Sequence, residues 1–179
     1  VDFPEIKNSI LKARKIKHQG YKLLNEYDIV IWCDGYWHPQ NNPGIFKILI
    51  NRCLNSKGGL IISPNPYRNC AYEECDEIVK EKKDTHERME KLKIFLQEKG
   101  LPKNVYSWRT TFMVIDRNNK NSCKLLDNLW GLLKDDIHTY RDQPLLSLAI
   151  HDTEIHPEKP DFLLEKAFVL GKRGNHRYT

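Results

Sequence analysis

Residues 27–39, with the sequence YDIVIWCDGYWHP, are the stretch that decides the predicted fold. The run begins with apolar and β-branched side chains and ends with a carboxylate, a glycine and a group of aromatic side chains. A short apolar run bounded by turn residues is typical of a strand buried on both faces. Asp34 then falls at the C-terminal end of this strand, where ligands bind in open α/β sheets. Asp34 is therefore a candidate for holding a metal or a polar substrate, although Asp-Gly is also a common turn pair.

The length and composition of the chain are those of a single soluble, globular domain. It has 179 residues, of which 40% are hydrophobic and 30% are charged. No apolar run approaches the length of a membrane span, and the first residues are too charged for a signal peptide. Because the first residue is Val1 and not Met, we expect a fragment or a processed chain.

The net charge and the cysteines limit the chemistry only loosely. The net charge of +5 is compatible with an anionic ligand such as a nucleotide diphosphate. Cys70 and Cys75 are the only close pair among five cysteines, and their spacing is not that of a zinc site. The odd number of cysteines favours a reducing compartment, and with no signal or membrane segment in this chain we expect a cytoplasmic location.

Strands and helices alternate along the chain, which predicts a single α/β domain. The middle of the longest helical pattern, residues 81–87, is nearly all polar and is expected to project into water or to bend. Apolar periodicity predicts helices over residues 5–25, 44–55, 71–99 and 123–133, with a further helix starting near residue 144. Strands are expected at residues 27–33, 60–62, 105–115 and 168–170, with loops elsewhere.

Two further groups of polar residues have both a structural and a functional interpretation. Asp142 lies at a predicted helix N-terminus, where backbone amides stabilise a carboxylate, or it pairs with Arg141 and Gln143 to bind a polyol. Arg14 and Lys17 lie on the basic face of the first helix. That face is solvated, or one or two of its cations reach a phosphate near the strand that follows.

Four segments, in order, resemble the glycosyltransferase-like family of the plant mucilage type, formerly a domain of unknown function. Each motif is short, so the resemblance depends on their order and spacing across residues 13–150. Residues 108–119 also resemble a strand of that family. The four segments are ARKIKH at residues 13–18, IWCDG at 31–35, PYRNCAYEE at 66–74 and RDQ at 141–143.

This resemblance implies a GT-A fold, a Rossmann-like, mixed and mostly parallel sheet flanked by helices. It also implies an enzyme that moves a sugar from a UDP- or GDP-sugar donor to a carbohydrate or other hydroxyl acceptor. Mn²⁺ or Mg²⁺ would then hold the donor diphosphate, because hard oxygen ligands suit these ions and their charge assists departure of the diphosphate. Nucleic acid is not an expected partner.

By the same resemblance, Asp34 takes the place of the acidic element that binds the metal. Tyr36 stands where a second carboxylate is usual, so Asp34 supplies at most one ligand. His38, His151, His156 or the C-terminal tail are the alternatives for another ligand, and the sequence does not choose among them.

Asp142 resembles the acidic residue beneath the donor sugar, either as the acceptor base or as the group that stabilises an oxocarbenium-like state. Arg68, Tyr72 and Glu73 match the junction motif, and a structural clamp of the loop is an equally good interpretation of them. The expected catalytic residues are Asp142, Arg141 and Gln143. The expected donor-binding residues are Arg14, Lys17, Trp32, Asp34, Gly35, Arg68, Trp108 and Arg109.

One departure from the family concerns the start of the chain. GT-A domains begin with a strand and loop that bind the nucleotide base, and we expect that segment to be missing from residues 1–179, which predicts poor nucleotide affinity. The first alternative function is an inactive relative that acts as a binding module. The second is a nucleic-acid-binding protein. Two features disfavour it: acidic and basic residues are interleaved, and no recognisable nucleic-acid-binding motif is present.

Overall fold

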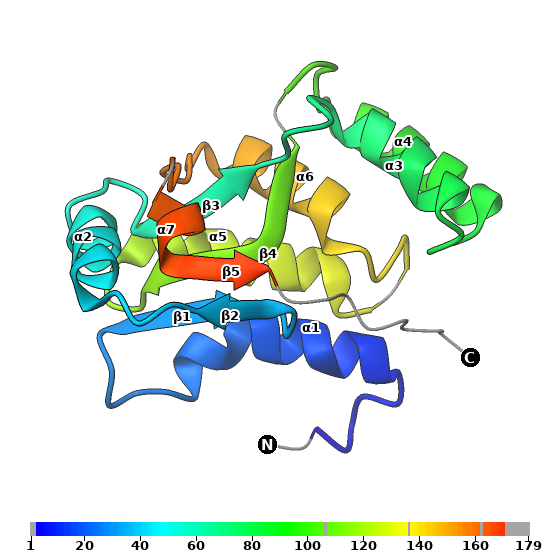
Figure 1. Ribbon diagram of the computed structural model, residues 1–179. Helices are drawn as coiled ribbons and strands as arrows, with labels where there is room; N and C mark the ends of the chain where they lie inside the picture. The colour runs from blue at the N-terminus through cyan, green and yellow to red at the C-terminus, as the bar shows by residue number, and fades with distance from the viewer. Residues whose placement is uncertain (1–2, 106, 136, 162, 171–179) are drawn as a thin grey trace.

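The computed structural model describes residues 3–105, 107–135, 137–161 and 163–170. Figure 1 shows two small sheets with helices packed around them. The helices are α1 (Ser9–Gln19), the 3-10 turn η1 (Gly20–Lys22), α2 (Pro43–Leu54), α3 (Ala71–Lys80), α4 (His86–Glu98), α5 (Lys120–Leu133), α6 (Asp142–Thr153) and α7 (Leu163–Ala167). The strands are β1 (Ile29–Cys33), β2 (Trp37–Pro39), β3 (Leu60–Pro64), β4 (Trp108–Asp116) and β5 (Phe168–Leu170).

The larger sheet has three strands in the order β1-β4-β3, and both of its strand pairs are antiparallel. The second sheet is the antiparallel pair β2-β5. Among the described residues, the single parallel contact is an isolated bridge between Ile61 and Glu158. The predicted mostly parallel, Rossmann-like GT-A sheet is therefore wrong.

The polar break at residues 81–85 explains this error. A single helix between two strands returns the chain to the end of the sheet where the first strand began. The second strand then runs parallel to the first. Here the expected helix over residues 71–99 is instead a hairpin of α3 and α4, which returns the chain to the end of the sheet where β3 stops (Figure 1). The next strand, β4, therefore runs back alongside β3, and it takes the central place between β3 and β1.

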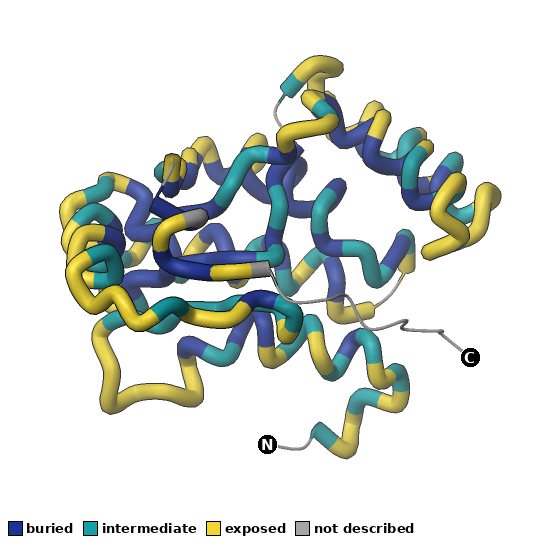
Figure 2. Tube along the Cα trace, viewed as in Figure 1, coloured by how far each residue is buried: buried dark blue, intermediate teal, exposed yellow. Residues whose placement is uncertain are grey.

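The larger sheet separates two apolar clusters, because successive side chains of a strand point to opposite faces. From β4, Met113 and Ile115 join one cluster, and Phe112 and Val114 join the other. The first cluster includes residues of α1 and of α3 to α6, and the second includes residues of α2, α7 and β5. Figure 2 shows this buried interior.

Several predicted elements have shifted limits. The first helix begins at Ser9, because the Asn8 side chain accepts hydrogen bonds from the backbone N–H groups of Ile10 and Leu11. The predicted loops contain β2 and α7, which are short elements with little periodic signal. β1 was expected to be buried on both faces. All five of its residues are instead half-buried, because β1 is an edge strand.

The pairing of β4 with β3 is interrupted close to the start of β4. Ile62 pairs with Met113, but the next residue, Ser63, pairs with Arg109. Residues 110–112 are thus without a partner in β3, which is the pattern of an extended bulge. Bulges redirect side chains, and this one includes Thr110, which points to α1 and α6.

Two general features of the chain also bear on function. Within the described residues, no helix is both long enough and apolar enough to span a membrane. All five cysteines are free thiols.

The approach of β3 to the start of α5 generates a stability prediction. Gly59 has a φ of +61°, and an added Cβ would lie 2.4 Å from the Cβ of Asn119. We expect Gly59→Ala to lower the free energy of unfolding by about 2 kcal/mol, through backbone strain and this clash. Urea denaturation measures the change.

Gly131 provides the matched control, because it lies within α5 and an added Cβ there meets nothing within 4 Å. Gly131→Ala is expected to stabilise the protein by up to about 1 kcal/mol, because alanine favours the helix more than glycine does. Equal effects of the two substitutions would contradict the described packing of β3 against α5.

Candidate functional site

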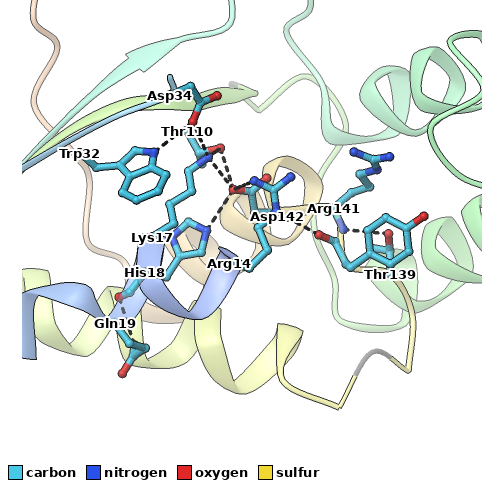
Figure 3. Close-up of polar contacts among 11 residues, drawn as sticks. Arg14, Lys17, His18, Gln19, Trp32, Asp34, Thr110, Thr139, Arg141 and Asp142 are labelled. Atoms are coloured by element: carbon cyan, nitrogen blue, oxygen red, sulfur yellow. Dashed lines mark hydrogen bonds and ion pairs between the residues drawn. The ribbon is translucent and has the colours of Figure 1, made fainter. Parts of the chain in front are cut away.

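The carboxylate of Asp142, the first residue of α6, is the centre of a buried polar cluster (Figure 3). Its side chain is only 4% exposed. Thr110 Oγ1 donates a hydrogen bond to Asp142 Oδ2 at 2.8 Å, and His18 Nε2 lies 3.0 Å from the same atom. Lys17 Nζ lies 3.1 Å and Arg14 Nη1 3.3 Å from it. All four contacts involve Oδ2, and Oδ1 takes part in none of them.

Lys17 connects this carboxylate to the second predicted acid, Asp34. The Lys17 ammonium lies 3.6 Å from Asp34 Oδ1, and it also donates a hydrogen bond to Thr110 Oγ1 at 2.9 Å. The Lys17 side chain is only 2% exposed. Trp32 Nε1 donates to Asp34 Oδ1 at 3.0 Å, so this oxygen is fixed from two directions, and Asp34 Oδ2 takes part in neither contact.

Four elements bring these side chains together. Arg14, Lys17 and His18 are spaced three and four residues apart on α1, so they share one face of that helix. Asp34 follows the last residue of β1, where its backbone N–H donates to the Thr111 carbonyl and continues the ladder with β4. The bulge of β4 and the N-terminus of α6 supply the remaining two groups. The cluster therefore joins one end of the larger sheet to two helices.

The charges around Asp142 keep it ionised. Burial alone would raise the pKa of Asp142, but the positive charges of Arg14 and Lys17 outweigh burial and hold that pKa well below its usual value. Burial lowers the pKa of His18 despite the neighbouring carboxylate, so this imidazole is neutral near pH 7. Its Nε2–H then donates to Asp142, and within the described residues its buried Nδ1 has no hydrogen-bond partner.

Other predicted site residues lie away from this cluster. The Arg141 side chain points away from Asp142 and binds the carbonyl of Lys83 (Figure 3). Arg68 Nε donates to Glu74 Oε2 at 2.6 Å. This contact joins the loop before α3 to the first turn of that helix, as the structural-clamp interpretation of Arg68 expects.

The junction and the strand residues also have defined places. The hydroxyl of Tyr72 donates to the Leu101 carbonyl at 2.7 Å. Gly35 lies in the turn between β1 and β2. Among the described residues, no hydrogen bond or ion pair joins Arg109 or Gln143 to Asp34, Lys17 or Asp142.

Trp108 lines a separate, mostly apolar pocket of about 250 Å³. Ser147, Ile150, His151 and His156 are also in its wall. Trp108 and Thr110 are two positions apart on β4, a distance of roughly 7 Å along a strand. The pocket is therefore a neighbour of the Asp142 cluster and not a part of it.

The predicted metal site has one candidate ligand at this position. Within the part of the chain that the structure describes, no group of three or more His, Cys, Asp or Glu side chains is arranged to hold a metal ion. Asp34 Oδ2 is an oxygen not engaged by Lys17 or Trp32, so Asp34 can supply one ligand to a cation. The assignment of Mn²⁺ or Mg²⁺ to Asp34 stays a prediction.

His18 belongs to the quoted motif at residues 13–18 but was not among the expected site residues, and Thr110 was not predicted at all. His18 follows Lys17 and lies four residues after Arg14, so the helical spacing contained a signal for it. Thr110 lies in the stretch of β4 whose register with β3 is irregular. No pattern in the sequence predicts that register.

Comparisons with protein-family models, with curated proteins and with solved structures find no match to this chain. The resemblance to the glycosyltransferase-like family therefore depends on the quoted motifs alone.

The buried ion cluster predicts a large effect of removing one charge. Asp142→Asn leaves the almost fully buried Lys17 ammonium without its nearest carboxylate. We expect a loss of about 3–5 kcal/mol in the free energy of unfolding at pH 7, measured by urea denaturation. Asp34→Asn is the control, because that side chain is 28% exposed and its loss should cost less than about 1 kcal/mol. Similar losses for the two variants would contradict the central place of Asp142.

The neutral, buried His18 predicts a dependence of stability on pH. Its pKa is lowered in the folded chain, so below about pH 6.5 the unfolded chain binds a proton that the folded chain does not. The free energy of unfolding should therefore fall as the pH drops from about 6.5 towards 5. In His18→Gln this part of the slope should disappear.

His138→Gln is the comparison, because partial burial also lowers the pKa of His138. Denaturation curves at pH 7, 6 and 5 measure both effects. His18 is not the group responsible if His18→Gln keeps the wild-type slope of unfolding free energy against pH while His138→Gln flattens that slope.

Proposed function

We propose that this chain is a glycosyltransferase domain that uses a nucleotide-diphosphate sugar as donor and a hydroxyl group as acceptor, with a divalent cation on the diphosphate. The support is the convergence of three distant motifs. Lys17, Asp34 and Asp142 come from three of the segments that resemble the glycosyltransferase-like family, and one ammonium lies within 3.6 Å of both carboxylates.

Stability alone does not explain such a cluster. Replacing a buried ion pair by apolar residues of similar volume is often neutral or stabilising, because desolvation of the charges is costly. Buried groups with strongly shifted pKa values concentrate at functional sites for this reason. A cluster of two acids, two bases and a neutral imidazole therefore favours a binding or catalytic role.

Asp34 and Arg14 are the groups assigned to the donor diphosphate. The side chains of Asp34 and Arg14 are 28% and 20% exposed, whereas those of Lys17 and Asp142 are almost fully buried. Mg²⁺ in particular is often held by one or two carboxylates together with substrate phosphates and water. A single carboxylate is thus compatible with a cation that arrives with the donor, and that cation would stabilise charge on the departing diphosphate.

Asp142 is assigned to the donor sugar as a charged group and not as a general base. A general base works best with a pKa near the working pH, and the pKa of Asp142 is held far below it. A permanently ionised carboxylate instead stabilises positive charge on the sugar ring and accepts a hydrogen bond from a sugar hydroxyl. Asp142 Oδ1, which takes part in none of the four contacts described above, is the atom proposed to accept the hydrogen bond from the sugar hydroxyl. Of the two roles expected from the sequence, the proposal adopts the stabilisation of an oxocarbenium-like state.

The test is a panel of UDP- and GDP-sugars with Mn²⁺ or Mg²⁺, followed by hydrolysis and by transfer to simple hydroxyl acceptors. We expect turnover with one donor in the wild type. Asp142→Asn should lower kcat by roughly a hundredfold or more with a smaller change in donor affinity. Asp34→Asn should abolish the dependence of donor binding on the cation.

The outcomes separate the candidate functions. A rise in melting temperature with nucleotide and cation but without turnover would indicate a binding module. A rise with oligonucleotides alone would refute the proposal, as would normal cation-dependent turnover in Asp34→Asn. Arg52→Met, which removes surface ion pairs with Glu158 and Asp161, is the control for a general effect of charge.

A further inference from the structure

The segment that leads into α6, residues 138–141, is fastened to the turn between α3 and α4. Arg88 Nε donates to the His138 carbonyl at 3.3 Å. The hydroxyl of Thr139 donates to Asp84 Oδ2 at 2.8 Å. Consecutive residues of the segment thus bind the same hairpin of helices.

The next two residues bind a single carbonyl of that turn. The Tyr140 hydroxyl donates to the Lys83 carbonyl at 3.3 Å, and Arg141 Nε donates to it at 3.1 Å. The guanidinium groups of Arg88 and Arg141 lie 5.2 and 5.0 Å from the centroid of the Tyr140 ring, within the range of cation–π attraction. The contacts therefore form a compact network and not a single bond.

The end of α3 leaves the Lys83 carbonyl available. Lys82 has a φ of +55°, and its N–H donates to the Val79 carbonyl at 2.9 Å. The N–H of Lys83 donates to the Ile78 carbonyl at 2.9 Å. This pattern closes the C-terminus of a helix. The Lys83 carbonyl lies beyond that closure, so it can accept bonds from Tyr140 and Arg141.

Thr139 transmits this attachment to the backbone next to Asp142. Its buried hydroxyl donates to Asp84 and accepts a hydrogen bond from the N–H of Arg141 at 3.0 Å. The Asp84 side chain is only 2% exposed. Arg14 secures the same stretch from the other side, because its Nε donates to the Tyr140 carbonyl while its Nη1 pairs with Asp142.

We propose that Thr139 and Arg141 are positioning residues that hold the Asp142 carboxylate in register with Lys17 by attaching the start of α6 to the α3–α4 turn. No described hydrogen bond or ion pair joins either side chain to Asp142, Lys17 or Asp34, so the role proposed for them here is positioning. The effect on turnover rests on the proposed transferase function. The effect on the geometry of Asp142 does not.

Thr139→Val tests this proposal, because it keeps the shape of the side chain and removes the hydroxyl. We expect kcat for transfer to fall roughly tenfold or more with donor KM within about twofold, because small displacements of a reacting group are costly. Thr139→Ser, which restores the hydroxyl, should recover most of the rate. The independent readout is NMR of the Asp142 carboxylate carbon and of the His18 ring nitrogens, whose signals should shift in Thr139→Val.

Thr153→Val is the matched control at the other end of α6. Its hydroxyl is also buried and donates to the Ala149 carbonyl at 2.7 Å, far from the cluster. We expect this variant to leave kcat and both NMR signals unchanged. If Thr139→Val does not fold, Arg141→Met, which removes the bond to Lys83, is measured in the same way.

Two results would overturn the proposal. The first is a folded Thr139→Val protein with wild-type kcat and unshifted signals of Asp142 and His18. The second is that both Thr139→Val and Thr153→Val lose rate in proportion to the fall in their melting temperatures. If the wild type transfers no sugar at all, the transferase function fails, and the NMR signals alone still decide whether Thr139 positions Asp142.

Discussion

The structure depends on the need to neutralise one buried ammonium group. Lys17 is almost fully removed from water, and an isolated charge in that position would cost several kcal/mol. Asp142 and Asp34 meet this need only if α1, the end of β1, the bulge of β4 and the start of α6 all come to the same point. Displacement of α1 or of the start of α6 would separate Lys17 from Asp142, its nearest carboxylate. The polar cluster thus constrains the fold, although the apolar clusters supply most of the burial.

The α3–α4 hairpin serves both the topology of the sheet and the geometry of this cluster. It returns the chain so that β4 runs antiparallel to β3, which brings Thr110 to the end of the sheet where Asp34 lies. Its turn also binds residues 138–141 and thereby fixes the start of α6. One polar interruption in the sequence, at residues 81–85, therefore sets the strand direction and supports Asp142.

The sequence contains the strands and the charged groups but not their arrangement. Alternating strands and helices predicted β1, β3 and β4 nearly where they lie, because β-branched runs are local signals. Strand direction depends on whether residues 71–99 form one helix or two, and a difference of a few polar residues decides it. The motifs identified Lys17, Asp34 and Asp142, which the structure brings together, but no local pattern shows that Thr110 would join them. The same motifs placed Arg141 beside the substrate, whereas its guanidinium binds the Lys83 carbonyl.

The charge balance of the cluster limits which ligands it can accept. Arg14 and Lys17 match Asp34 and Asp142, and His18 is neutral, so the formal charge of the group is zero. A diphosphate alone would meet two carboxylates, and a divalent cation alone would meet two fixed positive charges. A diphosphate that arrives with its cation carries little net charge and adds no large imbalance to a site of low dielectric. The zero formal charge around Lys17 and its two acids is therefore compatible with the metal–diphosphate complex of the proposed function.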